Sequence, residues 1–334
     1  MSNLLADNAF VCGLSGKLHI SACHPAVCDG PERRIDDGYK VFHWSHHAGP
    51  GWGDTNAYFA WLTEQDTRFE TTPHPDCDQV HAGMPEEHHQ TTWCCERAMD
   101  FIREREQDSR PWLFSINMFD PHHSFDPPQE RLERYLENLD RIPLPHYVED
   151  ELADKPPYQK MDHERSYNGH APIGDADLTS THHRMIRAAY WAMCDLIDAQ
   201  VGRVLDTLEA TGQLDNTIVV FHSDHGEMLG DHCIYLKGPY FYEEAIRVPL
   251  IIAWPEAIRT QRSTALVELT DLPQTLLDAA GLDHHPGMQG KSLWPILTAY
   301  SEPQHHRDDV YCEYYNSMPW HKDEAPQLTM LRSK

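Results

Sequence analysis

The stretch TIVVFHSDHGE, residues 217–227, decides the fold class. Its first half is a near-continuous apolar run, which is typical of a central parallel strand buried on both faces. In parallel α/β sheets, ligands bind beyond the carboxyl ends of the strands, so the polar residues that follow Phe221 are well placed for a site. The sequence therefore predicts an α/β protein with a functional loop directly after residue 221.

Further strands and helices are predicted on both sides of this run. Apolar runs predict strands at 10–14, 111–118 and 248–254, and a last strand that begins near residue 328. Three- and four-residue apolar spacing predicts helices at 91–106, 181–211 and 272–280, the second of them ending at Gly212. The segment 23–90 is predicted to be a long excursion with little regular structure, and 131–170 a surface insertion. Helices that alternate with strands indicate a β-α-β layout.

Composition excludes several classes of function. The 334 residues include 27 Lys and Arg against 53 Asp and Glu, for a net charge of −26, which argues against binding to nucleic acid or to an anionic membrane. The nine cysteines form no C-x-x-C pair, so neither a zinc ribbon nor a disulfide scaffold is expected. The first ten residues lack the segments of a signal peptide, so the chain as written is expected in the cytoplasm, although a longer parent protein could be exported.

Asp224 and His225 are candidate metal ligands in the loop after residue 221. A carboxylate oxygen and an imidazole nitrogen are both common ligands, and the glycine that follows them lets the backbone turn close to an ion. Lys237 could then pair with an anion held at that ion. The alternative is an ordinary polar loop in which Asp224 caps the next helix.

Two further clusters follow predicted strands. Lys17 and His19 come after the first strand, and alternation along an extended segment would send both side chains in one direction. His122 lies in DPHHSFDPP, residues 120–128, after the strand that ends near residue 118. Taken singly, each cluster is equally compatible with solvated side chains or a stiff proline turn. Because each follows the carboxyl end of a predicted central strand, we expect the clusters to serve one site.

The sequence resembles the sulfatases of the alkaline-phosphatase superfamily in five ordered motifs. GKLH at 16–19 is similar to the family's G-K-x-H, and PHHSF at 121–125 to its P-H-x-P-F/Y. SDHGE at 223–227, with Gly230 and Lys237, is similar to its metal-binding loop. YEEAIRVPL at 242–250 and TDLPQTLL at 270–277 resemble the two segments that follow that loop. Order and rough spacing agree over nearly the whole chain.

This resemblance implies an α/β/α sandwich with a mostly parallel central sheet and the hydrolysis of a small sulfate ester. By resemblance, Lys17 and Lys237 bind the sulfate oxygens, and His19 assists at the nucleophile. His122 contacts the sulfate or protonates the leaving oxygen. Asp224 and His225 are two ligands of a divalent metal ion, usually calcium. Since His225 stands where other members carry asparagine, and a nitrogen ligand suits manganese or zinc at least as well as calcium, manganese or zinc is the alternative.

The sequence departs from the family most seriously at the nucleophile. The resemblance implies a C-x-P-S-R segment, whose cysteine becomes formylglycine, and an aspartate pair, both upstream of G-K-x-H. Only sixteen residues precede Lys17, and they contain neither feature. CHPAV at 23–27 begins like the motif but lacks its serine and arginine and lies downstream of the expected place. Ser124 and Gln274 are smaller departures that remove no reacting group.

These features lead to an expected organisation and to three functional hypotheses. Residues 1–298 are expected to form a sulfatase catalytic domain that is incomplete at its N-terminus. Residues 299–334 are expected to begin a C-terminal subdomain, so the chain is expected to be truncated at both ends. The first hypothesis is a metal-dependent sulfatase. A phosphonate monoester or phosphodiester hydrolase of the same superfamily and a non-catalytic sulfatase fragment are the alternatives.

Overall fold

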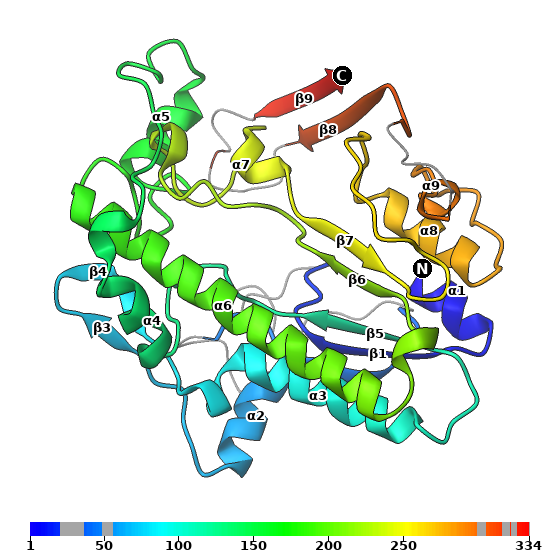
Figure 1. Cartoon of the computed structure of the whole chain (residues 1–334). Helices are drawn as coiled ribbons and strands as arrows, with labels where there is room; N and C mark the ends of the chain where they lie inside the picture. Colours follow the sequence, from blue (N-terminus) through cyan, green and yellow to red (C-terminus); the bar gives the residue numbers. More distant parts are fainter. Residues whose placement is uncertain (21–36, 49–55, 299–304, 316–320, 322–325, 334) are drawn as a thin grey trace. The chain divides into compact units, whose positions relative to one another are not determined.

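The computed structural model describes residues 1–20, 37–48, 56–298, 305–315, 321 and 326–333. Its contacts divide the chain into two compact units, each assembled from two segments. Unit 1 consists of Met1–Leu144 and Thr179–Leu214, and unit 2 of Pro145–Leu178 and Asp215–Lys334. Each unit is described by itself below (Figure 1).

Unit 1 is organised on a three-stranded parallel sheet in the order β2-β1-β5. The strands are β1 (Val11–Gly16), β2 (Tyr39–Trp44) and β5 (Trp112–Asn117). Every residue of β1, the central strand, is buried, as expected for an apolar run with a neighbour on each side. The carboxyl ends of β1 and β5 meet at one edge, where Gly16 pairs with Asn117.

Helices and a hairpin complete unit 1. The helices are α1 (Ser2–Asp7), α2 (Ala57–Glu64), α3 (Gln90–Arg105), α4 (Gln129–Leu136) and the 31-residue α6 (Ser180–Ala210). The hairpin consists of β3 (Thr72–His74) and β4 (Cys77–Ala82), and short 3-10 turns occupy η1 (Glu86–His88) and η2 (Leu139–Arg141). Tyr58, Leu62 and Trp93 are among the core residues that join α2 to α3.

The boundaries of α6 follow from its sequence. Thr179 forms a capping box with His182, which satisfies the first free N–H groups of the helix. Beyond the other end, Gly212 adopts φ +67° and donates its N–H to the carbonyl of Glu209. A glycine tolerates this left-handed conformation without strain, and the predicted helix end at Gly212 is confirmed.

Unit 2 contains two antiparallel strand pairs and short helices. The pairs are β6 (Val219–His222) with β7 (Leu250–Ala253), and β8 (Asp309–Tyr315) with β9 (Gln327–Ser333). The helices are α5 (Pro157–Glu164), α7 (Glu243–Ile246), α8 (Asp271–Ala279) and α9 (Trp294–Leu297). The turn η4 spans Asp231–Cys233, and η3 (Leu214–Asn216) lies where the chain passes from unit 1 to unit 2. Apolar residues of α8 and of the β6–β7 pair line one small cavity, so this helix packs on that pair.

The structure confirms the α/β class but corrects the expectation for residues 217–221. β6 was expected to be a parallel strand buried on both faces, whereas its partner β7 runs antiparallel to it. Phe221 is 37% exposed and Ile251 is 61% exposed. An apolar run indicates a preference for burial, but it does not indicate whether the neighbouring strand is parallel or antiparallel.

The expectation of little regular structure in 23–90 is also wrong for the described residues. They contain β2, α2 and the β3–β4 hairpin. β2 was missed because polar and aromatic residues are mixed in Tyr39–Trp44 without a clear period. Likewise, the predicted insertion 131–170 contains α5 and most of α4, and Leu132 of α4 is completely buried.

In the described part of the chain, no helix combines the length and the apolar composition that a bilayer span requires.

Candidate functional site

Lys17 is fixed at the carboxyl edge of the unit 1 sheet. Its N–H donates to the carbonyl of Asn117 at 2.9 Å, and the Asn117 amide donates back to the Lys17 carbonyl at 2.7 Å. Gly16 precedes it with φ +96°, and a Cβ there would lie 2.0 Å from the Asn117 carbonyl oxygen. A side chain at position 16 would therefore separate β1 from β5, and the glycine keeps Lys17 at this edge.

His19 does not follow the alternation that the sequence predicted. Its φ of +54° takes the backbone out of the extended conformation two residues after Lys17. The His19 ring makes an edge contact with the His46 ring, at 4.8 Å between centroids. His46 is buried and contacts Phe119 at 5.6 Å, so the histidine is positioned by ring packing and not by strand geometry.

His122 reaches the same ring cluster from β5. Its ring lies 4.6 Å from Phe119 and stacks on His123 at 4.1 Å. Its Nδ1 is 2.7 Å from the His123 carbonyl oxygen, to which it can only donate. The proton on Nδ1 leaves Nε2 as the nitrogen that exchanges a proton with a ligand. Contacts within unit 1 thus connect Lys17, His19 and His122 with the carboxyl edge of its sheet.

Sequence reasoning missed a pair of carboxylates beside this edge. Asp120 accepts a hydrogen bond from the Thr91 hydroxyl at 2.7 Å and lies 3.6 Å from His89 Nδ1. Asp120 and Asp126 line one pocket together with His89 and other residues of unit 1. Burial and the Asp120 carboxylate raise the pKa of Asp126 well above its ordinary value. DPHHSFDPP places both aspartates near His122, but sequence spacing alone does not show that they converge.

Asp224 and His225 lie in unit 2, directly after β6. His225 Nε2 is 3.8 Å from Asp224 Oδ1, and the Asp224 side chain is 65% exposed. His225 Nδ1 donates to the Gly226 carbonyl at 2.8 Å, so Nδ1 carries the ring proton of the neutral side chain and Nε2 carries the lone pair. The next helical segment begins only at Asp231, so Asp224 does not cap a helix. Asp224 and His225 therefore place a carboxylate oxygen and an imidazole nitrogen next to each other after β6.

Gly226 and Glu227 shape the loop that carries these ligands. Gly226 donates its N–H to the Ala245 carbonyl at 2.8 Å, and a Cβ on it would lie 1.8 Å from the Glu244 carbonyl oxygen. The half-buried Glu227 carboxylate accepts hydrogen bonds from the N–H groups of Leu229 and Leu236. Glu227 therefore closes the loop onto the residue next to Lys237.

Lys237 lies in an environment of aromatic and acidic groups within unit 2. Its ammonium is 5.6 Å from the centre of the Tyr167 ring, a distance at which a cation is attracted to the ring face. Burial raises the pKa of Glu227, and the positive charge of Lys237 opposes that rise. Burial, followed by the Glu227 and Asp162 carboxylates, raises the pKa of Tyr167 well above its ordinary value. Glu227 and Tyr167 were not predicted as partners of Lys237.

The predicted residues therefore fall into two sets. Lys17, His19 and His122 lie in unit 1, while Asp224, His225 and Lys237 lie in unit 2. CHPAV at 23–27, which resembles the start of the nucleophile motif, lies outside the described residues. Within the described residues, one group of three side chains is arranged to hold a metal ion, and it includes none of the predicted ligands.

Comparison with known proteins agrees with the motif analysis. The sulfatase family model matches residues 35–282. The uncharacterized sulfatase YidJ of Escherichia coli is 31% identical over 248 residues, which are 73% of this chain and 47% of that protein. An arylsulfatase of Clostridium perfringens is 31% identical over 219 residues, 64% of this chain and 43% of that protein. The chain spans about half the length of these curated relatives.

The fold is also similar to that of a solved structure. The phosphonate monoester hydrolase from Silicibacter pomeroyi aligns with a TM-score of 0.76 over 99% of this chain and 69% of that chain, at 22% identity. Such a low identity establishes the fold alone, and this fold is the predicted alkaline-phosphatase-like α/β class. Since the family model covers most of the sequence, the chain belongs to the sulfatase family.

Proposed function

We propose that the chain carries the substrate-binding and metal-binding residues of a sulfate ester hydrolase that acts on a small sulfate ester. The observation that supports this most directly is the Asp224–His225 pair, whose potential ligand atoms lie 3.8 Å apart after β6, in a chain of the sulfatase family. By the same resemblance, we assign residues 1–298 to the catalytic domain and 299–334 to the start of a smaller subdomain.

Asp224 and His225 have the donor atoms that two ligands of a divalent metal ion require. The hydrogen bond from His225 Nδ1 to Gly226 fixes the tautomer that offers Nε2, and the exposed Asp224 carboxylate has room to turn toward an ion. Calcium is the first candidate from the family resemblance. Manganese is the alternative, because a nitrogen ligand suits it better than calcium. When bound, such an ion polarises a sulfate oxygen and stabilises negative charge in the transition state.

The remaining residues supply charge and a proton. Lys17 and Lys237 would bind the sulfate oxygens and neutralise the charge that develops on them. His19 would hold a proton at the nucleophile. His122, with Nδ1 bonded to the His123 carbonyl, would give the proton on Nε2 to the leaving oxygen. These roles follow the family resemblance residue by residue.

Two alternatives from the sequence analysis stay open to experiment. The printed sequence contains no C-x-P-S-R segment, which keeps the non-catalytic alternative in place. A phosphonate monoester or phosphodiester hydrolase would use nearly the same residues, and the nitrogen ligand His225 is equally compatible with it. Turnover of an aryl sulfate compared with an aryl phosphonate ester distinguishes the two hydrolases.

The first experiment measures 4-nitrophenyl sulfate hydrolysis by the purified chain with calcium or manganese. Asp224→Ala and Lys237→Ala should each remove the activity, whereas Asp283→Ala, at an exposed aspartate of unit 2, should retain it. A folded wild-type chain that turns over neither ester would favour the non-catalytic alternative.

A second measurement does not depend on turnover. Calorimetric titration with manganese should show binding that Asp224→Ala and His225→Ala each weaken by about tenfold or more. Equal manganese affinity in the wild type and both variants would remove the metal-ligand assignment of these two residues.

A further inference from the structure

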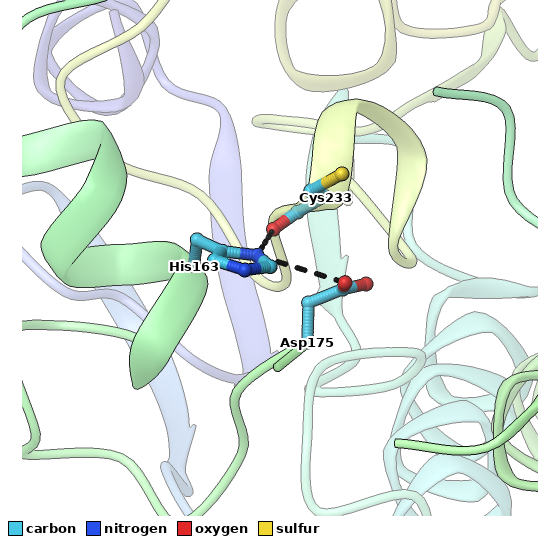
Figure 2. Close-up of side chains that lie close together, drawn as sticks. All are labelled: His163, Asp175 and Cys233. Carbon is cyan, nitrogen blue, oxygen red and sulfur yellow. Dashed lines mark hydrogen bonds and ion pairs between the residues drawn. The ribbon is translucent and has the colours of Figure 1, made fainter. Parts of the chain in front are cut away.

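Three side chains of unit 2 form a cluster that the proposed hydrolysis does not use. His163, Asp175 and Cys233 each offer one potential ligand atom, and these atoms lie within 4.8 Å of one another. Figure 2 shows His163 beside Asp175, with the Cys233 carbonyl facing His163 and the Cys233 sulfur on the far side of that residue. Each side chain is half-buried, so an ion from solvent could reach the cluster while the protein shields one side of it.

Backbone hydrogen bonds hold the three residues in place. His163 lies in the last turn of α5, and its carbonyl accepts the N–H of Asp175 at 3.0 Å. Cys233 ends η4, with its own N–H bonded to the Gly230 carbonyl at 3.1 Å. His163 Nδ1 is 2.9 Å from the Cys233 carbonyl oxygen, which ties the helix to the turn. In the absence of an ion, these contacts keep the three residues close together.

The orientation of the side chains agrees with a metal site that needs a small rearrangement. His163 Nδ1 lies 3.6 Å from Asp175 Oδ2 and faces both other residues (Figure 2). The Cys233 sulfur lies beyond the carbonyl of that residue, and it moves by rotation about a single bond, χ1. In a tetrahedral zinc site the ligand atoms lie about 3.4–3.6 Å apart, so a contraction of about 1 Å completes the geometry.

We propose that His163, Asp175 and Cys233 bind a zinc ion. A nitrogen, a carboxylate oxygen and a thiolate form a ligand set that zinc accepts in tetrahedral geometry, with water as the fourth ligand. The thiolate favours zinc over calcium or magnesium, which prefer oxygen ligands. On binding through Nδ1, His163 gives up its hydrogen bond to the Cys233 carbonyl, and its one ring proton is exchanged through solvent onto Nε2. Cys233 Sγ loses its proton to solvent, so binding releases one proton in total.

The consequence is a cross-link within unit 2. Residues 157–175 carry two of the ligands, and the third lies four residues before Lys237 in the loop that Glu227 closes. Zinc would thus hold α5 and the loop after it against the turn that precedes Lys237. This ion is separate from the one proposed at Asp224 and His225, and it would stabilise the fold instead of polarising a substrate.

Cobalt substitution provides the direct test with the full chain. Co²⁺ bound by a thiolate gives a charge-transfer absorption in the near ultraviolet, and tetrahedral Co²⁺ absorbs strongly in the visible. We expect both signals from the wild type, and we expect Cys233→Ser to lose the thiolate absorption. Cys312→Ser removes another half-buried thiol of unit 2 and should keep it. Asp224→Ala should also keep it, which separates this site from the hydrolytic one.

Zinc affinity and thermal unfolding give the second readout. Saturating zinc should raise the Tm of the wild type by about 5 °C or more at a roughly hundredfold excess over Kd. His163→Gln and Asp175→Asn should each lower zinc affinity by about tenfold or more, with circular dichroism used to verify folding. A thiolate absorption that persists in folded Cys233→Ser, or no such absorption in folded wild type, would overturn the proposal.

Discussion

Glu227 combines a structural and an electrostatic contact in one side chain. It is half-buried and accepts hydrogen bonds from the N–H groups of Leu229 and Leu236, and it lies close enough to Lys237 for that charge to affect its pKa. We predict that Glu227→Gln lowers the free energy of unfolding by about 1–2 kcal/mol, because both N–H groups donate to Oε1 and the amide replaces a charged acceptor with a neutral, weaker one. Urea denaturation measures this loss. Glu256→Gln, at an exposed position of unit 2, should change stability little, and equal effects in the two variants would contradict the assignment.

Asp126 predicts a dependence of stability on pH. Its pKa in the folded protein lies well above the ordinary aspartate value, mainly because of burial and also because of the Asp120 carboxylate. Between the unfolded and folded pKa values, the folded protein holds a proton that the unfolded chain releases, so stability falls as pH rises through this window. Asp126→Asn cannot release that proton.

The Asp126→Asn variant should therefore lose less stability than the wild type between the acidic and the neutral end of that window. Chemical denaturation at a series of pH values provides the measurement. Asp76→Asn, at an exposed aspartate of unit 1, is the matched control and should follow the wild-type curve. Parallel curves for Asp126→Asn and the wild type would show that Asp126 is ionised in both states.

At the scale of elements, the loop between β6 and α7 depends on one close backbone approach. A Cβ on Gly226 would lie 1.8 Å from the Glu244 carbonyl oxygen, so Gly226→Ala must displace one of the two segments. We predict that it lowers the free energy of unfolding by about 1–3 kcal/mol and lowers manganese affinity at the adjacent ligand pair.

A glycine within a helix provides the control for that loop. In α6, a Cβ added to Gly202 would meet no atom within 4 Å, so Gly202→Ala should raise stability by about 0.5–1 kcal/mol through helix propensity. Thermal unfolding of the two variants compares the effects. Stabilisation by both substitutions would show that the loop relaxes freely around residue 226.

The elements that the sequence predicted well are those with a clear apolar period and an end signal. α3 and α6 agree with the predictions to within one residue at either end, since their buried faces recur at helical spacing. β2 was missed because its Lys40 and His43 interrupt any apolar pattern. The antiparallel direction of β7 was not predictable from 248–254, because the direction of pairing depends on how the intervening chain returns.

In the candidate site, too, the contacts between residues far apart in the sequence were not predictable. Motif resemblance singled out Lys17, His122 and Asp224, because each belongs to a short motif that directly follows a predicted strand. The ring cluster of His46 and Phe119 was not identified, since packing between residues 73 positions apart leaves no local pattern. The separation of His163, Asp175 and Cys233 along the chain concealed the proposed zinc ligands for the same reason.

For the whole molecule, the net charge of −26 predicts a selectivity for substrate size. A long sulfated polyanion is repelled over many charges at once, whereas a small sulfate monoester is repelled only weakly. If the chain is active, kcat/KM for a sulfated polysaccharide should rise with salt as the Debye length falls from about 30 Å at 0.01 M to about 3 Å at 1 M. For 4-nitrophenyl sulfate the change should be small. Comparable salt dependence for both substrates would argue against this electrostatic selection.

The two segments of unit 1 have a consequence for biosynthesis. α6 belongs to unit 1 although 34 residues of unit 2 precede it in the chain, and its Arg203 pairs with Glu96 of α3. Just beyond the end of α6, Gln213 accepts a hydrogen bond from Trp112 of β5. As the ribosome releases the chain from its N-terminus, β1, α3 and β5 emerge long before their covering helix. The apolar surface of unit 1 that α6 covers therefore stays exposed until the ribosome has released the chain as far as residue 214. During that interval a chaperone has access to this surface.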